Sequence, residues 1–494
     1  MLLKLLKPID AVLNRFTMYR VVLYGLIALL AAAEGLALTG MLQLSAGGLA
    51  LSIVALVVSC YAANKLCAWA ARAATNTESW LITALILACI LPPVSSLARF
   101  GLVALAGAVA MAAKYVLVWR GSHIFNPAAI AAFVLSTAGL LPATWWIATP
   151  ALVPFTTLLA AVVLRKQRKF ALAICFGLAA VAMLVLVSVG LHDRVLLETL
   201  KQAIKSWPII FMGSIMLTEP STLPATRYYQ LLYGVLVGAV FSAQLHVGRF
   251  ATSPEASLLV GNLFTLFFTP GIGMLLRLSY LQQLSPDIFQ AVFEPPRRRL
   301  AFAPGQYLEW TLPHQHTDSR GNRRTFSIAS SPTEADIQIG FRHYQPSSSF
   351  KTALLALKPG QYIRAAHVAG SFLLPDDPSE PLLLIAGGIG ITPFRSMVKY
   401  LTDAQQTRNI TLLYFANRPE DFVYREVFET ARAAGVDTRY LVGRPDTAAV
   451  RANAPDFAKR TAYLSGPDAL VSNCKIMLQE LGVKHIKTDH FSGY

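Results

Sequence analysis

The sequence predicts a multi-domain chain: a polytopic α-helical membrane domain, then an antiparallel β-barrel, then an α/β domain built on a parallel sheet. Residues 1–280 are almost continuously apolar, whereas charged and apolar residues alternate after them. Short alternating runs separated by Pro-Gly pairs follow, which indicates antiparallel strands. Leu382–Phe394 then reads LLLIAGGIGITPF, the pattern of a buried parallel strand, a glycine-rich turn and a helix.

The membrane domain, residues 1–280, is expected to cross a bilayer about ten times, with inverted repeats. Apolar runs occur at Val21–Leu44, Leu49–Ala71, Trp80–Ala98, Gly101–Trp119, Pro127–Leu141, Trp145–Leu164, Phe170–Gly190, Ile209–Leu217, Tyr229–Leu245 and Ser257–Leu278. The first run does not fit a signal peptide, because further runs follow it. Lysine and arginine gather in the loops that lie inside if both termini are inside. We therefore expect a multi-pass protein of the cell inner (cytoplasmic) membrane, with its soluble part in the cytoplasm.

The net charge of the chain is +16, which raises the possibility of a nucleic-acid partner. No basic helix, zinc-ligand spacing or interleaving of aromatic and basic residues accompanies the charge, so no nucleic acid is expected as a partner. Part of the excess lies in loops that meet anionic lipid, which makes membrane lipid a partner. The five cysteines form no CxxC pair and no metal-ligand spacing, so no metal site is expected.

Two pairs of segments in the membrane domain look alike. Asn76–Pro93 and Trp207–Pro224 both run from a polar or aromatic start through a short apolar stretch into prolines. Ser122–Phe133 and Ser253–Phe264 form a weaker pair. Proline-broken half-helices at matching places in two halves are typical of inverted repeats that enclose a site near the membrane midplane.

The runs LITALILACILPP, SHIFNPAAIAAF and MLTEPSTLP, in this order, make residues 20–280 resemble a known family of membrane proteins. It is the membrane-subunit family shared by Rnf complexes and the sodium-translocating NADH:quinone oxidoreductase. The resemblance implies a membrane-embedded FMN, which this family commonly esterifies to a threonine. Ile147–Pro150 (IATP) matches only the end of the attachment motif, so Thr149 is one candidate, and noncovalent FMN or no FMN are the alternatives. Asn126, at a half-helix end, either helps to hold the flavin or only caps its helix.

Residues 287–378 are expected to form the antiparallel barrel, after a linker at Leu278–Asp287. Its strands are expected at Ile288–Phe293, Tyr307–Leu312, Arg324–Ile328, Ile337–His343 and Gln361–His367. Pro304-Gly305 and Pro359-Gly360 are typical turn pairs between them. The barrel is therefore expected to be small.

One of these strands carries Arg324, Thr325, Phe326 and Ser327 in a row. Because side chains alternate across a strand, Arg324 and Phe326 are expected on one face, and the two hydroxyl residues on the other. An arginine can bind a pyrophosphate, an aromatic ring can stack on a flavin, and a hydroxyl can reach a ring nitrogen. Taken alone, such a strand is also common on protein surfaces.

Residues 379–494 are expected to alternate strands and helices around a parallel sheet. Strands are expected at Leu382–Ala386, Ile410–Phe415, Thr438–Val442, Ala462–Leu464 and Ile486–His490. Gly387, Gly388 and Gly390 allow positive φ angles and a close approach of the backbone to a pyrophosphate. The helix that begins near Pro393 points free N–H groups at the negative charge. This turn is therefore a predicted dinucleotide site.

The order of these motifs makes residues 287–494 resemble the ferredoxin–NADP⁺ reductase family. The resemblance implies an NAD(P)H-dependent FAD oxidoreductase. It assigns to FAD the residues Arg324, Thr325, Phe326, Ser327, Arg342, His343, Ser349, Lys351, Thr352, Gly370 and Phe372. It assigns to the nicotinamide dinucleotide Gly387, Gly388, Gly390, Thr392, Pro393, Gly466 and Pro467, with Ser465 beside the nicotinamide where many relatives have cysteine.

Three side chains, Ser327, Ser465 and Tyr494, are expected at the reacting rings, and either Phe491 or Tyr494 is expected to stack on the flavin. Arg418 can pair with a 2′-phosphate, but Glu420 and Asp421 beside it would repel one, which favours NADH slightly.

The predicted function is therefore that of a membrane-bound flavoprotein oxidoreductase in electron transport. Electrons pass from NAD(P)H through FAD to a membrane-embedded FMN, and on to a quinone, a redox partner protein or an extracytoplasmic acceptor. The alternative is a solute transporter with a redox-sensing reductase domain. A haem-containing reductase is disfavoured, because His123, His192 and His246 lie on separate segments.

Overall fold

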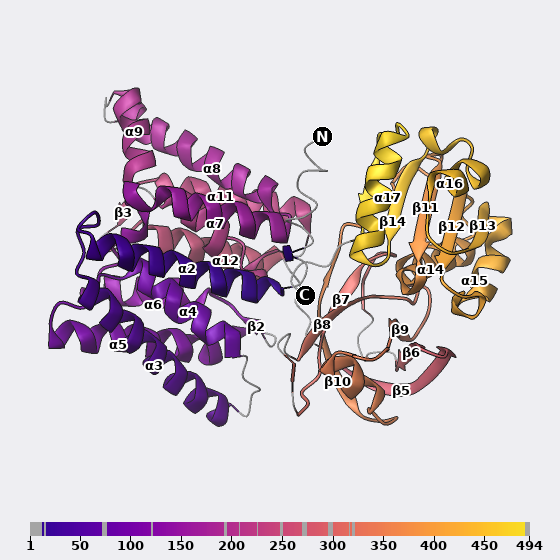
Figure 1. Cartoon of the computed structure of the whole chain (residues 1–494), viewed down its shortest axis with the longest axis horizontal. Helices are drawn as coiled ribbons and strands as arrows, with labels where there is room; N and C mark the ends of the chain where they lie inside the picture. The colour runs from indigo at the N-terminus through magenta and orange to yellow at the C-terminus, as the bar shows by residue number, and fades with distance from the viewer. Residues whose placement is uncertain are drawn as a thin grey trace. The chain divides into compact units, whose positions relative to one another are not determined.

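The computed structural model describes residues 12–489, apart from residues 14–15, 72–76, 120–121, 192–194, 207, 225, 248–249, 269–273, 295–299, 316 and 319–321. The chain divides into two compact units, essentially Met1–Pro270 and Gly271–Ser492. The first is drawn in indigo to pink and the second in rose through orange to yellow (Figure 1). The division lies a little before the position that the sequence predicts.

The first unit is built of helices and two short hairpins (Figure 1). Its α-helices are α2 (Met18–Leu38), α3 (Ala46–Ala70), α4 (Thr77–Ile90), α5 (Leu97–Val116), α6 (Pro127–Thr137), α7 (Val153–Gln167), α8 (Phe170–Val185), α9 (Leu196–Ser206), α10 (Ile209–Phe211), α11 (Arg227–Ser242) and α12 (Pro254–Phe268). π-Helical turns at Leu186–Leu191 and Met212–Met216 continue α8 and α10.

Four helices of the described residues are long and apolar enough to cross a membrane: Met18–Leu38, Ala46–Ala70, Leu97–Val116 and Phe170–Gly190. The expectation of about ten spans is therefore not supported. Prolines shorten several of the apolar runs, because proline lacks an N–H and disrupts the preceding helical turn. For example, α4 ends at Ile90 just before Pro92, whereas the predicted run continues to Ala98.

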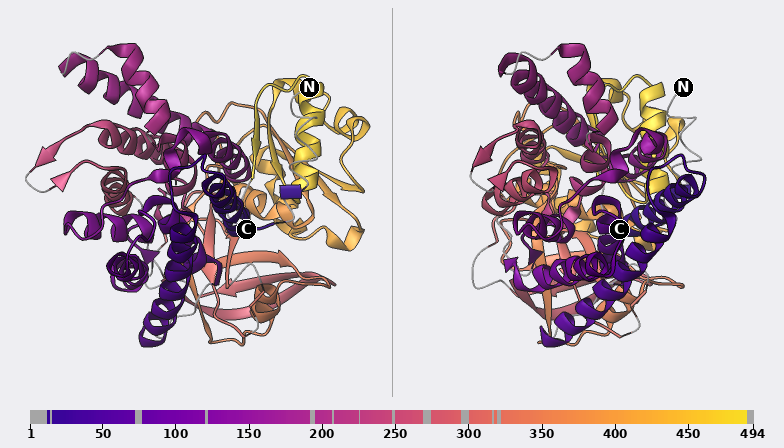
Figure 2. Two further views of the ribbon diagram at one scale, coloured as in Figure 1. Left: turned by 60° about the vertical axis from the view of Figure 1, so that its left-hand side comes forward. Right: turned by 90° about the vertical axis from the view of Figure 1, so that its left-hand side faces the viewer.

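The order of elements repeats within the first unit. The series α4, α5, a hairpin of β1 (Val118–Trp119) and β2 (Ser122–His123), then α6, recurs as α10, α11, a hairpin of β3 (His246–Val247) and β4 (Phe250–Ala251), then α12. The second hairpin is the pair of short arrows at the left edge of the left view in Figure 2. α5 packs on α3 as α11 packs on α8, and the two short helices α6 and α12 pack on each other. This recurrence supports an internal repeat.

The second unit begins with a six-stranded antiparallel sheet in the order β8-β7-β10-β5-β6-β9. The strands are β5 (Met274–Ser285), β6 (Ile288–Phe293), β7 (Tyr307–Thr311), β8 (Arg323–Ser327), β9 (Ile337–Arg342) and β10 (Tyr362–Ala369), with α13 at Ser349–Leu355. The antiparallel strands are confirmed. A closed barrel is not supported, because β8 and β9 are the outer strands of the pairing order.

Strand β5 replaces the linker that the sequence predicts at Leu278–Asp287. Burial alternates along its first residues, with Met274 and Leu276 buried and Leu275 exposed, as in a strand with one face on a core. It lies between β6 and β10 in the sheet. Because its first residues are mostly apolar, they extend the preceding apolar run, and the sequence pattern hides the change from helix to strand.

The second sheet is parallel throughout, in the order β13-β12-β11-β14-β15. Its elements are β11 (Leu382–Gly387), α14 (Thr392–Asp403), β12 (Ile410–Ala416), α15 (Arg425–Thr430), β13 (Val436–Val442), α16 (Thr447–Asn453), β14 (Thr461–Ser465), α17 (Asp468–Glu480) and β15 (Ile486–Thr488). Every residue of β11 is buried, because helices cover both faces of the sheet. Leu384 packs with α14 and α15, and Leu383 with α16 and α17. The predicted parallel sheet is confirmed.

Candidate functional site

The glycine-rich turn joins β11 to α14 at the carboxyl edge of the parallel sheet. Gly388 has a φ of +54°, and a Cβ added there would meet only Arg342 Nη1, at 3.6 Å. A Cβ on Gly390 would lie 2.5 Å from the Cα and N atoms of Gly466, which follows the neighbouring strand β14. The two loops therefore touch backbone to backbone, while the turn stays open at Gly388. This cradle fits the close approach of a dinucleotide.

The first residues of α14 close the same turn. The Thr392 hydroxyl donates to Ile389 O at 3.1 Å, and Pro393 stands in the first turn of the helix, where its missing N–H is not needed. Both side chains are buried. At Gly387 a Cβ would meet Leu470 Cδ1 at 2.5 Å, so a larger residue there would have to displace the end of that side chain. Backbone N–H groups are thus the donors that this turn can offer to an anion.

Strand β8 presents the predicted flavin residues as the alternation requires. Arg324 is buried, and its guanidinium lies 5.6 Å from the ring of Phe350. The Phe326 ring lies 5.9 Å from the same ring, so Arg324 and Phe326 share a face. Ser327, two residues after Thr325 on the other face, is buried.

Helix α13 brings the other predicted diphosphate residues to this strand. Arg324 Nη2 donates to Asp318 at 2.9 Å, and the Ser349 N–H donates to the same carboxylate at 3.1 Å. Thr352 Oγ1 lies 3.4 Å from His343 Nε2, and Lys351 Nζ donates to the Arg342 carbonyl at 2.9 Å. The predicted arginine, serine and threonine are therefore assembled at one end of the antiparallel sheet.

Two serines from different sheets meet on one carboxylate. The hydroxyl of Ser465, at the end of β14, donates to Asp489 Oδ2 at 3.1 Å, and the hydroxyl of Ser327 donates to the same oxygen at 3.5 Å. Asp489 is anchored by its own N–H, which donates to Leu464 O at 2.9 Å. Sequence reasoning assigns no role to Asp489. One sequence feature could have pointed to Asp489. It lies near the end of the last predicted strand, and the ends of these strands fall at the carboxyl edge of the sheet, where the site lies.

The structure gives Arg342 and Arg418 other partners than the sequence predicts. Arg342 donates to Asp287 at 2.8 Å and to Asp421 at 2.6 Å, and Arg418 donates to Asp421 at 2.9 Å and to Asp287 at 3.1 Å. The Asp421 side chain is 0% exposed. Burial opposes its charge, but hydrogen bonds from Arg418, Ser285 and Arg342 hold the pKa of Asp421 below its usual value. Arg418 is therefore tied into an ion-pair cluster instead of facing a 2′-phosphate.

Phe372 was expected beside FAD, but its side chain belongs to a hydrophobic core. It is buried, with its ring 5.6 Å from that of Phe394 and 5.2 Å from that of Tyr463. Gly370, with a φ of +119°, does occupy a conformation that favours glycine. Pro467 directly precedes α17, beside the positive-φ Gly466. The predicted stacking residues Phe491 and Tyr494 lie outside the described residues.

In the first unit, Asn126 caps its helix and also joins a buried polar cluster. Its Oδ1 accepts from Ala129 N at 3.0 Å, and its Nδ2 donates to Glu219 at 2.8 Å. Its backbone N–H donates to Asn262 Oδ1 at 2.9 Å, which links α6 to α12. Glu219 also lies 3.3 Å from His123 Nε2. The capping role is therefore confirmed, and the flavin role stays a prediction.

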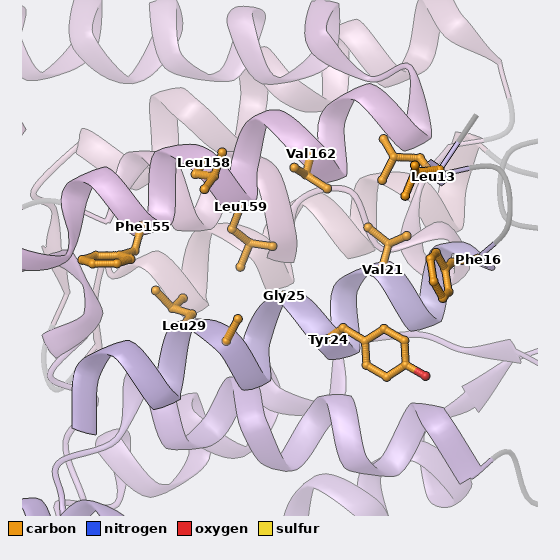
Figure 3. Close-up of a pocket in the computed structure, with 12 residues that line it drawn as sticks. Leu13, Phe16, Val21, Tyr24, Gly25, Leu29, Phe155, Leu158, Leu159 and Val162 are labelled. Atoms are coloured by element: carbon orange, nitrogen blue, oxygen red, sulfur yellow. The ribbon is translucent and has the colours of Figure 1, made fainter. Parts of the chain in front are cut away.

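Thr149 lies between two 3₁₀ turns, Trp146–Ala148 and Pro150–Leu152. Its buried hydroxyl has no hydrogen-bond partner in the described part of the chain. The residues before it, Ile147 and Ala148, line a cavity of about 340 Å³ whose other walls are mostly apolar. A second cavity, of about 320 Å³, lies between α2 and α7 and is lined by apolar side chains and Tyr24 (Figure 3). The Thr149 hydroxyl thus follows directly on residues that line the first cavity.

Comparison with known proteins bears on the second unit. Residues 384–473 match the oxidoreductase NAD-binding domain family. The second unit is similar to reductases that include ferredoxin–NADP reductases. This similarity favours an oxidoreductase role for the second unit.

The relatives differ in the share of their own length that aligns with this chain. Reductase component 1 of terephthalate 1,2-dioxygenase from Comamonas sp is 31% identical over 185 residues, which are 36% of this chain and 53% of that protein. Ferredoxin–NADP reductase B from Sorangium cellulosum is 27% identical over 240 residues, 44% of this chain and 96% of that protein. The crystal structure of the Amycolatopsis cytochrome P450 reductase GcoB has 21% identity and a TM-score of 0.41, covering 45% of this chain and 71% of that one. The chain thus spans about half the length of the first of these relatives.

Proposed function

We propose that the chain is a membrane-bound flavoprotein that passes electrons from NAD(P)H through FAD to a membrane-embedded FMN, and on to a quinone, a redox partner protein or an extracytoplasmic acceptor. The observation that carries the proposal is the meeting of Ser327 and Ser465 on Asp489. Ser327 belongs to the strand predicted to hold the flavin, and Ser465 to the loop edge predicted to hold the nicotinamide. The two serines therefore meet at the place where the nicotinamide, as hydride donor, and the flavin, as acceptor, would face each other.

In the reductase-like domain, some residues bind the two cofactors and others position the reacting groups. Arg324 and the Ser349 N–H offer the charge and the donor that a flavin diphosphate needs. The open turn at Gly388 receives the dinucleotide. The buried hydroxyl of Ser465 keeps water from the reacting edge and donates to Asp489, which fixes its orientation. FAD, when bound, supplies the change from hydride donation to single-electron transfer.

For the donor, we propose NADH over NADPH. The Arg418 guanidinium is paired with Asp421 and Asp287, and Glu420 lies 3.5 Å from it. A 2′-phosphate placed there would meet these carboxylates, and repulsion between like charges lowers its affinity.

For the membrane unit, we propose a second flavin beside Thr149, whose free hydroxyl and adjoining cavity fit a covalently held ring. Inverted repeats, a multi-pass topology in the cytoplasmic membrane and a cytoplasmic reductase-like domain complete the proposal. Among the relatives are proteins named as reductase components of oxygenase systems, which supports a redox partner as an acceptor.

The test is flavin analysis of the detergent-purified full chain, followed by anaerobic mixing with NADH. The proposal expects extractable FAD that bleaches on mixing, and a second flavin seen either as FMN in the extract or as a fluorescent band on a denaturing gel. Loss of that band in Thr149→Ala would locate the attachment. A preparation that contains FAD but no other flavin would remove the membrane flavin, and one that contains no FAD would overturn the whole electron path.

A further inference from the structure

A carboxylate of the chain itself holds the groups assigned to the flavin diphosphate. Arg324 Nη2 donates to both oxygens of Asp318, at 2.9 Å and 3.2 Å. The Ser349 N–H donates to Asp318 Oδ2 at 3.1 Å, and the Asp318 N–H donates to Ser349 Oγ at 2.8 Å. His314 Nε2 lies 3.0 Å from the same hydroxyl. Asp318 is thus bound much as an anionic ligand would be.

Burial makes this pairing significant. The Arg324 side chain is only 8% exposed, and that of Asp318 is 25% exposed. A buried guanidinium without a counter-charge is strongly unfavourable, so Asp318 stabilises the site when no other anion is present. Carboxylate and phosphate oxygens are recognised by the same donor geometry of arginine, and so they compete for the same N–H groups.

We propose that Asp318 is an internal competitor for the flavin diphosphate: it occupies Arg324 and the Ser349 N–H in the flavin-free chain and is exchanged for the diphosphate when FAD binds. The inference rests on the proposed FAD site. If Asp318 holds these donors most of the time, the apparent affinity for FAD falls by the fraction of chains that are open. The competition concerns the diphosphate only, because Arg324 and the Ser349 N–H are assigned to the diphosphate and not to the ring system.

The experiment uses the full chain, purified in detergent and stripped of flavin. FAD and riboflavin, which lacks the diphosphate, are titrated while the quenching of flavin fluorescence is followed. In Asp318→Asn the apparent dissociation constant for FAD should fall by about tenfold, and the association rate should rise, because the competing charge is removed. Riboflavin binding should not change. Asp318→Ala serves as a second variant should the asparagine retain a hydrogen bond to Ser349.

The matched control is Glu309→Gln. Glu309 pairs with Arg323 at 3.3 Å on the strand pair β7–β8, so the variant removes one carboxylate near the same strand while leaving Asp318 in place. It should leave FAD binding unchanged. If both Asp318 variants bind FAD as tightly as the wild-type chain or more weakly, the proposal that Asp318 competes with the diphosphate is wrong. If neither the wild-type chain nor any variant binds FAD, the FAD site itself is wrong, which distinguishes the two failures.

Discussion

The carboxylate of Asp489 connects two serines that lie far apart in the sequence. It accepts from Ser465 at 3.1 Å and from Ser327 at 3.5 Å. A hydroxyl that donates to a fixed carboxylate presents its lone pairs in one direction, so Asp489 acts as a positioning residue through both serines. Small displacements of reacting groups have large effects on rate, which makes this carboxylate a sensitive point.

In Asp489→Asn we expect the rate of flavin reduction by NADH to fall about tenfold, with a smaller change in NADH affinity, because the serines lose their common acceptor. Stopped-flow reduction over a range of NADH concentrations separates the two parameters. Asp437→Asn is the control, since Asp437 is an exposed carboxylate on β13 whose partner is Arg439. An equal loss in both variants would argue against a positioning role.

Two glycines of the same turn should respond differently to alanine. In Gly390→Ala the new methyl would lie 2.5 Å from Gly466, so we expect a loss of stability of about 2–3 kcal/mol together with loss of NADH-dependent reduction. In Gly388→Ala the methyl has room, and only the positive φ is unfavourable, by about 1 kcal/mol. Chemical denaturation of both variants measures the difference. Similar losses at both positions would mean that backbone contact between the loops is unimportant.

At the scale of elements, an ion-pair cluster links the antiparallel sheet to the parallel one. Asp287 lies in the turn between β5 and β6, and Arg342 ends β9, whereas Arg418 and Asp421 follow β12. Ser285 Oγ donates to Asp421 at 2.8 Å, which adds the end of β5 to the cluster. Asp287 and Asp421 each accept from both arginines, so part of the connection between the sheets depends on the charge of Asp421.

Asp421→Asn should reduce the stability of the reductase-like domain by about 2 kcal/mol at neutral pH, because two arginines lose a buried counter-charge. The pKa of Asp421 lies below its ordinary 3.8, so its contribution is complete above pH 3.8 and disappears as the pH falls through the lower folded value. The unfolding temperatures of wild type and variant should therefore converge once the pH falls below the folded pKa of Asp421.

Glu420→Gln is the control for this prediction. Glu420 is 50% exposed and lies 3.5 Å from Arg418, and exposed pairs contribute less than about 1 kcal/mol. A difference between wild type and Asp421→Asn that stays constant from neutral to acid pH would show that charge is not the cause.

In the first unit, the cap of α6 is also part of the cluster around Glu219. Asn126→Ala removes the cap to Ala129 N and a donor to Glu219, so we expect a loss of about 2 kcal/mol. Ser96 caps α5 through Arg99 N at an exposed position, and Ser96→Ala should lower stability by about 1 kcal/mol or less. Melting temperatures in detergent compare the two variants. A larger loss of stability in Ser96→Ala than in Asn126→Ala would contradict the claim that the cluster around Glu219 adds to the effect of the Asn126 cap.

Local patterns were predictable and distant partners were not. The turn at Gly387–Gly390, the start of α14 and the alternation on β8 depend on neighbouring residues, and all three are confirmed. The pairing of Arg418 with Asp287, the meeting of Ser327 with Ser465, and the core position of Phe372 depend on contacts between distant segments. Periodicity carries no information about such contacts.

At the scale of the whole molecule, fragments of the chain can test whether the second unit begins before β5. A fragment of residues 271–494 should fold and bind FAD, whereas a fragment of residues 287–494 should be insoluble, because β5 is an interior strand between β10 and β6. Circular dichroism and flavin titration of both fragments measure this. A folded, FAD-binding shorter fragment would mean that β5 is dispensable.

The interior position of β5 also bears on how the chain is made. β5 leaves the ribosome directly after the helical unit, and β6 follows it at once, but its other neighbour, β10, begins only at Tyr362. Until then one edge of β5 carries unpaired N–H and C=O groups, which are a template for aggregation. Translation that pauses between Phe293 and Tyr362 should therefore make the nascent chain dependent on chaperones, whereas a pause after β10 has left the ribosome should not.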